Sequence, residues 1–344
     1  MAVEIRALNF EEHGAWDDFV LRHPCGSSFH LTAWKKAIES VFNYKPFYLV
    51  AVDSGVIQAV LPLFLIDNFL MGKVLISSPF AVYGGVLSVS DEASGALRES
   101  IIRLGKDLGV QYVELRNGYP QQCLGFSPVN RYVTFTQPVE PRDGEQLLAA
   151  LPKKTRNMVR KACKNAYSVR SAQQLKSFED LISRSYQRLG TPCFPPRWFS
   201  ALREAFGDLV DVREVMLNDV VVAVSMNFFF RDQMHTFYAA SDPEYLNFAP
   251  NNYLYFDHLL WAGNNGYRVF DFGRSKLDTG TFEFKKHWAT EMRELPYEIL
   301  LAARKDLPNF TPKNEKFSLA IRTWQKLPLP VTRLLGPRLI RLFP

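Results

Sequence analysis

The sequence lacks the residue patterns of several common sites. Its four cysteines are scattered and form no CxxC pair, so neither a disulfide framework nor a zinc site is predicted. Its six histidines show no HExxH motif or paired metal spacing. There is no GxSxG elbow, no P-loop and no GxGxxG after a strand. We therefore expect no bound metal and no bound cofactor.

Long apolar runs are also missing. The longest lies around residues 56–66 and falls well short of the ~18 residues that a membrane-spanning helix needs. The N-terminus carries Glu4, Glu11 and Glu12 and has no apolar core of the length found in a signal peptide. These features predict a cytoplasmic protein. The 344 residues, 47% of them apolar, suffice for two domains of about 100–200 residues each.

Acidic residues are absent from one internal segment. No acid occurs between Glu145 and Glu179, although the net charge of the whole chain is only +6. The stretch LPKKTRNMVRKACKN (151–165) is predicted to be a helix, on which Arg156 and Arg160 share one face with two lysines. This face is either an ordinary solvated surface or a binding surface for an anion.

The C-terminal part, residues 319–344, has no acids either. Its leucines alternate with arginines, and Pro328, Pro330 and Pro337 divide it into short pieces. Such a segment either lies on an anionic membrane surface or packs on the domain that precedes it.

The remaining pattern is a weak internal repeat of about 160 residues. Residues 47–66 and 212–230 each read as strand, turn and strand, and each pair precedes a predicted helix, 91–108 or 250–264. The strands GVQYVELR and GYRVFDFG follow these helices, and a constant offset sets Glu114 against Asp271. The repeat predicts two similar α/β domains.

The second copy carries additional chemistry in FDFGRSKLDTGTFEFKKHW (270–288). Ligands of α/β sheets usually bind at the end of such a strand. Arg274 and Lys285 are candidates to hold an anion or a developing oxyanion, and Asp271 is a candidate to assist proton removal. A buried Asp–Arg pair that merely orders a loop is the alternative interpretation.

These residues resemble those of the FemA/FemB/FemX-like proteins of the GNAT superfamily. The resemblance rests on F-D-F-G followed by G-x-F-x-F-K, on FYAASDPEYLNFAPNNYLYFDHLLWAGNNG (237–266), on the basic segment LPKKTRNMVRKA, and on SSPFAVYGG and LGVQYVELR near the middle of the first half. It covers residues ~5–300 and is closest to the group associated with exopolysaccharide and PEP-CTERM gene clusters.

The resemblance implies an α/β fold of two tandem GNAT-like domains, each a mixed sheet flanked by helices. We expect an N-terminal domain over 1–145, a basic junction helix over 146–166, a C-terminal domain over 167–305 that carries the site, and a basic Leu/Pro-rich tail over 306–344.

The resemblance also implies an acyltransferase or aminoacyltransferase (EC 2.3 class) that acts on an amine of a cell-envelope or exopolysaccharide precursor. Lys285 would then stabilise the acyl oxyanion, Asp271 would orient the amine or act as base, and Tyr238 would donate a proton to the leaving group. The residues expected to bind substrate are Arg274, Ser275, Phe284, Arg156, Arg160, Asn251 and Tyr83.

The donor is expected to be a cosubstrate, either acyl-CoA or aminoacyl-tRNA. The loop [QR]xxGx[GA] of acyl-CoA users is missing, since QRLGTP (187–192) ends in proline, and the long helical arm of some tRNA users is missing too. Two other classes stay open: a non-catalytic protein that binds a saccharide or lipid carrier, and a tRNA-binding module. Peripheral contact of 319–344 with the inner face of the membrane is a further expectation, and DNA is not expected as a partner.

Overall fold

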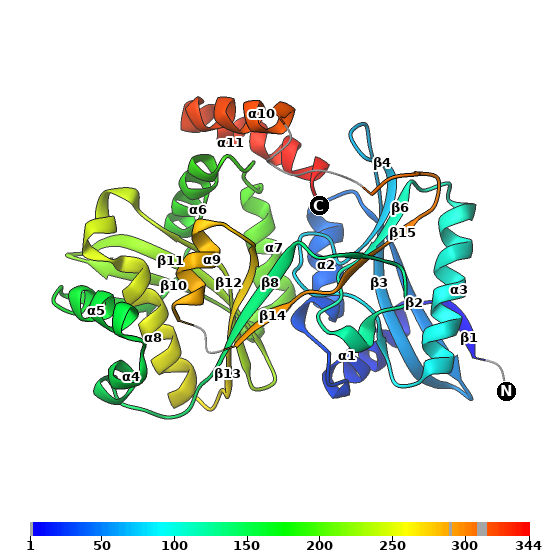
Figure 1. Ribbon diagram of the computed structural model, residues 1–344, viewed down its shortest axis with the longest axis horizontal. Coiled ribbons are helices and arrows are strands. Elements are labelled where there is room, and N and C mark those ends of the chain that lie inside the picture. Colours follow the sequence, from blue (N-terminus) through cyan, green and yellow to red (C-terminus); the bar gives the residue numbers. More distant parts are fainter. Residues whose placement is uncertain (1–2, 289–290, 308–314) are drawn as a thin grey trace. The chain divides into compact units, whose positions relative to one another are not determined.

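The computed structural model describes residues 3–288, 291–307 and 315–344, and its chain forms two compact α/β units (Figure 1). Unit 1 consists of the described residues of Met1–Arg131, Glu294–Phe310 and Arg341–Pro344. Unit 2 consists of those of Tyr132–Arg293 and Thr311–Ile340. The expected domain limits of 1–145, 146–166 and 167–305 stay predictions, and part of the expected tail, 308–314, lies outside the described residues.

Unit 1 is built on an eight-stranded mixed sheet in the order β1-β2-β3-β4-β6-β15-β7, with β5 paired to β3. Its core gathers apolar side chains from β2, β3, β6 and the helix α3. Its elements are β1 (Glu4–Ala7), η1 (Phe10–Glu12), α1 (His13–Arg22), η2 (Ser28–His30), α2 (Thr32–Val41), β2 (Lys45–Asp53), β3 (Val56–Asn68), β4 (Gly72–Ser77), β5 (Leu87–Ser88), α3 (Asp91–Asp107), β6 (Tyr112–Leu115), η3 (Pro120–Gln122), β7 (Ser127–Val129) and β15 (Tyr297–Leu301).

Unit 2 is built on a seven-stranded mixed sheet in the order β14-β8-β13-β12-β11-β10-β9. The elements from its first strand to its first long helix pair are β8 (Tyr132–Pro138), α4 (Gly144–Ala150), α5 (Lys153–Ala162), β9 (Tyr167–Ser171), α6 (Lys176–Leu189), α7 (Pro196–Phe206) and η4 (Gly207–Leu209). The elements that follow are β10 (Val210–Leu217), β11 (Val220–Phe230), β12 (Gln233–Ser241), η5 (Pro243–Phe248), α8 (Pro250–Asn264), β13 (Val269–Lys276), α9 (Gly280–Lys286), β14 (Glu291–Glu294), α10 (Glu315–Lys326) and α11 (Leu329–Leu339). The short helix η6 (Ile340–Leu342) begins in unit 2 and ends in unit 1.

The two faces of the second sheet bury different sets of side chains. One face packs Phe270 and Phe272 of β13 against α4, α5 and α8, and against Phe282 of α9. The other face lies under α6 and α7, where Trp198 contacts Tyr238. Because side chains alternate along a strand, Asp271 points away from the two phenylalanines that flank it.

The predicted repeat is present in the structure. In unit 1 the helix α3 joins the parallel strands β4 and β6, and in unit 2 the helix α8 joins the parallel strands β12 and β13. Each sheet also contains a strand from the other half of the sequence. β15 pairs with β6 in the first sheet, and β8 pairs with β13 in the second. Corresponding positions of the two sheets are therefore filled by segments that are far apart in the chain.

Most predicted elements are confirmed. Helices 91–108 and 250–264 correspond to α3 and α8, and the basic stretch 151–165 contains α5. The turn between β10 and β11 places Asn218 and Asp219 at positive φ, a conformation that these two residue types tolerate.

Helices α10 and α11 of the tail pack against α6 in unit 2. Trp324 of α10 donates a hydrogen bond to the carbonyl oxygen of Thr191, and Thr332 and Gly336 of α11 are buried. The opposite side of these helices is exposed and includes Leu319 and Leu334. None of the helices in the described part of the chain is both long and apolar enough to cross a membrane.

Candidate functional site

The parallel strands β12 and β13 separate partway along their length. Across the described residues their pairing runs from Gln233–Val269 to His235–Asp271 and then ends. Beyond this point β12 continues alongside β11, while β13 shifts its register on β8 between Asp271 and Arg274. Gly273 lies in this shift at φ +75°, in the left-handed region that favours glycine. Beyond the separation, the carbonyl oxygens of Gly273 and Arg274 in β13 are bonded by a side chain of α9 instead of by β12.

Asp271 is almost fully buried, with 1% of its surface exposed. Its Oδ1 accepts hydrogen bonds from the hydroxyl of Thr134 at 3.1 Å and from the backbone N–H of Gly273 at 2.7 Å. Its Oδ2 accepts from the side-chain amide of Gln233 at 2.9 Å. The carboxylate therefore fixes the irregular turn of β13, which is an architectural contribution.

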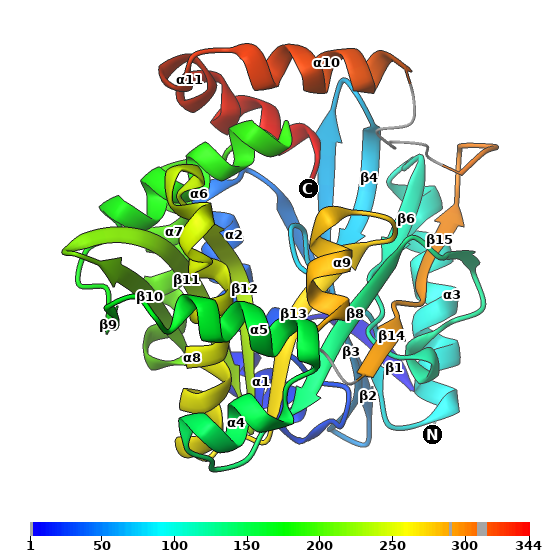
Figure 2. The same ribbon diagram turned by 60° about the vertical axis from the view of Figure 1, so that its left-hand side comes forward.

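Lys285 reaches the separated strand from α9, which Figure 2 shows beside β13 and β8. The side chain of Thr279 caps the start of this helix. The ammonium group of Lys285 donates hydrogen bonds to the carbonyl oxygens of Gly273 at 3.0 Å and Arg274 at 3.2 Å. Two of its three N–H groups are thereby used. The third has no acceptor among the described residues.

Burial lowers the pKa of Lys285 from 10.5 to about 8. The charge of Asp271 opposes this change, and the nearby charge of Arg274 adds to it. Removal of an ammonium group from water disfavours its charged form. Lys285 is therefore mostly protonated at neutral pH but loses its proton far more readily than an exposed lysine does.

His235 belongs to this site although the sequence gave no reason to select it. It lies opposite Asp271 in the strand pair, and its Nδ1 is 4.0 Å from Oδ2 of Asp271. A Cβ atom added to Gly273 would lie 2.8 Å from Nε2 of His235 and 3.7 Å from Nζ of Lys285. Burial lowers the pKa of His235 and so favours the neutral form of its ring. Only the register of β12 on β13 reveals this neighbourhood.

The other predicted residues of β13 and α9 occupy distinct environments. The guanidinium of Arg274 lies over the ring of Tyr132 at 4.4 Å. Ser275 is buried, and its hydroxyl has no hydrogen-bond partner among the described residues. Phe284 packs against Tyr255 at the edge of the core. Its position thus serves packing.

Tyr238 lies in an aromatic cluster below α7. Its hydroxyl accepts a hydrogen bond from the indole N–H of Trp198 at 3.0 Å, and its ring contacts Phe194 and Phe199. Burial raises the pKa of Tyr238 well above its ordinary value, so the phenol keeps its proton. A role as proton donor to a leaving group stays a prediction.

The remaining predicted residues are spread over both units. Arg156 is half-buried on α5 and donates to the carbonyl oxygen of Ala149, while Arg160 is exposed on the same helix. Asn251 lies half-buried in the first turn of α8. Tyr83 belongs to unit 1, where it is buried against Phe29.

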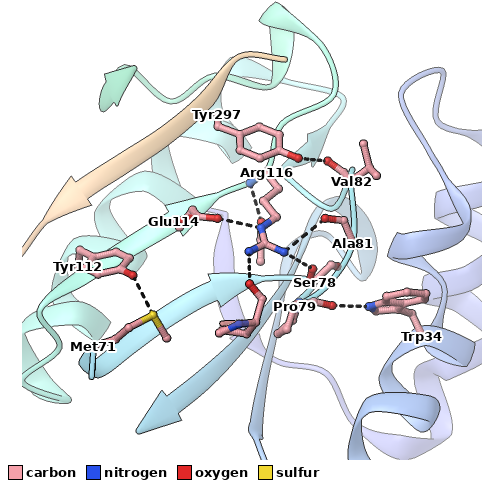
Figure 3. Close-up of polar contacts among 12 residues, drawn as sticks. Trp34, Met71, Ser78, Pro79, Ala81, Val82, Tyr112, Glu114, Arg116 and Tyr297 are labelled. Carbon is pink, nitrogen blue, oxygen red and sulfur yellow. Dashed lines mark hydrogen bonds and ion pairs between the residues drawn. The ribbon is translucent and has the colours of Figure 1, made fainter. Parts of the chain in front are cut away.

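The equivalent place in unit 1 is filled by an arginine. β4 and β6 pair only at Leu75–Val113 and Ile76–Glu114, and Arg116 follows directly after β6. Its side chain is buried, and its Nε lies 2.8 Å from the carboxylate of Glu114. Figure 3 shows this bond and those that the guanidinium donates to the carbonyl oxygens of Ser78 and Ala81. The repeat offset aligns Arg116 with Gly273. Unit 1 therefore has a buried arginine–glutamate ion pair where unit 2 has Gly273 and Lys285.

Comparisons with known proteins agree with this architecture. Residues 153–286 match the family model described as an acetyltransferase (GNAT) domain. No curated protein sequence matches the chain significantly. The match to the acetyltransferase (GNAT) domain covers much of unit 2, including α9 and Lys285. It confirms the predicted class of acyltransferase.

Three solved structures share the fold. FemX is 17% identical, with a TM-score of 0.68 over 87% of this chain and 98% of that chain. L-PGS from Bacillus licheniformis is 12% identical, with a TM-score of 0.54 over 93% and 98% of the two chains. A tandem GNAT protein from the clavulanic acid biosynthesis pathway is 13% identical, with a TM-score of 0.53 over 88% and 100%. The predicted Fem-like fold of two tandem GNAT-like domains is confirmed.

Proposed function

We propose, from a GNAT domain match that includes Lys285, that this protein transfers an acyl or aminoacyl group to an amine of a cell-envelope or exopolysaccharide precursor. One observation carries the proposal: the ammonium group of Lys285 sits where β12 and β13 separate and keeps one N–H uncommitted among the described residues. A preorganised donor of this kind is what a developing oxyanion requires.

In the proposed reaction the amine nitrogen forms a bond to the acyl carbonyl carbon. The carbonyl oxygen becomes an oxyanion, which the third N–H of Lys285 stabilises. Collapse of the tetrahedral intermediate breaks the bond to the sulfur or oxygen of the leaving group. The proton of the attacking amine passes to a base, for which His235 and Asp271 are the nearest candidates, and the leaving group is protonated in turn.

We assign substrate binding to arginine side chains of unit 2. Arg274 would hold a phosphate or carboxylate of a substrate while its guanidinium stays stacked on Tyr132. On α5, Arg160 is exposed and Arg156 half-exposed, and both would contact an anionic part of the donor or acceptor. The loop between β12 and α8 runs over residues 242–249 and contains the short helix η5, so a phosphate-binding glycine loop does not occupy this position.

The donor is either acyl-CoA or aminoacyl-tRNA. The two are distinguished by incubating the protein with each donor and a labelled amine, and by measuring the salt dependence of tRNA affinity, which is steep where Arg and Lys side chains neutralise phosphates. Transfer from acyl-CoA but not from aminoacyl-tRNA would identify acyl-CoA as the donor. Binding of tRNA or saccharide without any transfer would instead indicate a non-catalytic binding protein.

We propose that the protein lies in the cytoplasm and docks on the inner face of the membrane. Leu319 and Leu334 are 68% and 66% exposed on the outer side of α10 and α11, and no acid follows Glu315. Replacing both leucines with glutamate should abolish binding to vesicles that contain phosphatidylglycerol, whereas Leu246→Glu, an exposed leucine outside the tail, should not. Equal binding by all three proteins would contradict membrane docking.

The physiological acceptor is tested by mass spectrometry of envelope saccharides and exopolysaccharide in a deletion strain. We expect an acylated or aminoacylated amine in the parent strain that is missing in the deletion and returns with the wild-type gene. Return of the same modification with a Lys285→Met gene would refute the assigned site. No difference between parent and deletion would refute this class of acceptor.

A further inference from the structure

A cavity of about 700 Å³ opens in unit 2 among α6, α7 and α11. This volume is typical of sites for small organic ligands. Phe194, Phe199 and Ile182 form part of an apolar wall, and charged side chains from α6 and α11 also line the cavity. It does not include Lys285, His235 or Asp271 and is thus separate from the candidate catalytic centre.

Most charges of the cavity are already paired. Arg184 lies 2.8 Å from the carboxylate of Asp180 and 3.6 Å from that of Asp242. Arg333 of α11 also bonds Asp180, and it donates hydrogen bonds to the hydroxyl of Ser183 at 3.0 and 2.9 Å. These two arginines and two aspartates therefore neutralise one another and hold α11 against α6.

Glu179 is a charged residue of the cavity wall that lies outside this paired group. Its half-buried carboxylate has no hydrogen-bond or ion-pair partner among the described residues, and burial raises its pKa. Lys176, one turn earlier, is exposed at the rim and likewise forms no ion pair or side-chain hydrogen bond with the residues that the structure describes. A half-buried carboxylate beside an apolar wall is suited to an ammonium group attached to an apolar body.

We propose that this cavity binds an amphiphilic primary amine, with its ammonium group on Glu179 and its apolar part against Phe194 and Phe199. Both phenylalanines contact Tyr238 of β12, the strand that also carries His235. The inference concerns binding alone and does not rest on the acyl-transfer proposal.

The test uses the full chain and two probes of equal chain length, octylamine and octanoate. Calorimetric titration should show saturable 1:1 binding of octylamine, and octanoate should bind at least tenfold more weakly because Glu179 repels it. Glu179→Gln should weaken octylamine binding about tenfold or more, since a hydrogen bond between two charged groups is lost. The matched control is Glu204→Gln on α7, an exposed glutamate that does not line the cavity and should bind octylamine as the wild type does.

Three outcomes would overturn the proposal. They are equal binding of octylamine and octanoate, unchanged octylamine affinity in Glu179→Gln, and no binding of octylamine at all. Thermal unfolding of each variant shows whether it is folded. Because the readout is binding, a failure here leaves the role of Lys285 untouched, and loss of transfer in a Lys285 variant leaves this site untouched.

Discussion

The ammonium group of Lys285 lies 3.0 Å from the carbonyl oxygen of Gly273, twelve residues earlier in the chain. That carbonyl is turned toward α9 because Gly273 adopts φ +75° in the register shift of β13. A glycine that departs from strand geometry and a lysine on the next helix thus form a single unit. The central predictions concern what this unit does.

Replacement of Lys285 by methionine should abolish acyl transfer while the protein stays folded. Methionine keeps most of the length of the side chain but removes a half-buried charge, which desolvation disfavours. The thermal midpoint should be equal to or above that of the wild type. The measurements are transfer of a labelled acyl group and thermal unfolding, with Lys286→Met, an exposed neighbour on the same helix, as the control. Full activity in Lys285→Met would remove Lys285 from the mechanism.

Activity should depend on pH through the same group. The pKa of Lys285 is about 8, so its ammonium form is lost as the pH rises through this value, and kcat should fall along an alkaline limb centred there. The conservative variant Lys285→Arg keeps its charge throughout this range and should show no such limb in any activity that it retains. If kcat of Lys285→Arg still falls near pH 8, the titration belongs to a group other than Lys285.

The pKa change also predicts how stability responds to pH. The pKa of Lys285 is lower in the folded protein than its unfolded value of 10.5. Between about 8 and 10.5 the unfolded chain binds more protons, so the free energy of unfolding contributed by this group rises with pH in that window. Denaturant unfolding of wild type and Lys285→Met at pH 7.5 and 9.5 should show a difference that shrinks at the higher pH. A difference that grows would contradict the assignment.

Gly273→Ala should disturb both the fold and the site. A Cβ atom there would lie 2.8 Å from Nε2 of His235, and the positive φ alone costs a non-glycine residue about 1–2 kcal/mol. We expect a loss of at least this size in denaturant unfolding and a lower transfer rate. Gly280→Ala is the control, because an added Cβ atom would meet nothing within 4 Å there. Gly280 is the first residue of α9, where alanine is tolerated. Equal stability of the two variants would show that the turn of β13 is not required.

Asp271→Asn separates the charge of this residue from its architectural role. Asparagine keeps one oxygen to accept from Gly273 and Thr134, so the loss of stability should stay near 1 kcal/mol. The charge of Asp271 raises the pKa of Lys285, so its removal should shift the alkaline limb of activity to lower pH. An unshifted limb would mean that Asp271 does not act on Lys285 electrostatically. Asp271→Ala, which leaves three donors without an acceptor, should be less stable than Asp271→Asn.

Local sequence patterns were sufficient for the repeat and for the strand pairs and helices that form it. Alternation and turn residues predicted the strand pairs of both halves, and the constant offset between Glu114 and Asp271 predicted that β6 and β13 are equivalent. These features depend on residues close in the chain, for which periodicity and turn chemistry are direct physical signals. The second copy alone carries the glycines, Arg274 and Lys285, and the resemblance to the Fem-like proteins then gave Lys285 its expected role.

Tertiary structure decided which side chains meet. His235 is placed beside Asp271 and Lys285 by the register of a parallel pair whose connection contains all of α8, and no local pattern encodes that register. The same holds for the exchange of β8 and β15, which are assigned to their sheets by pairing across more than a hundred residues. The sequence by itself determined two similar α/β halves and a basic strand end in the second. Long-range pairing and burial decided that a histidine, a glycine carbonyl and a lysine share one site, because only close approach in a desolvated environment gives these groups their charge states.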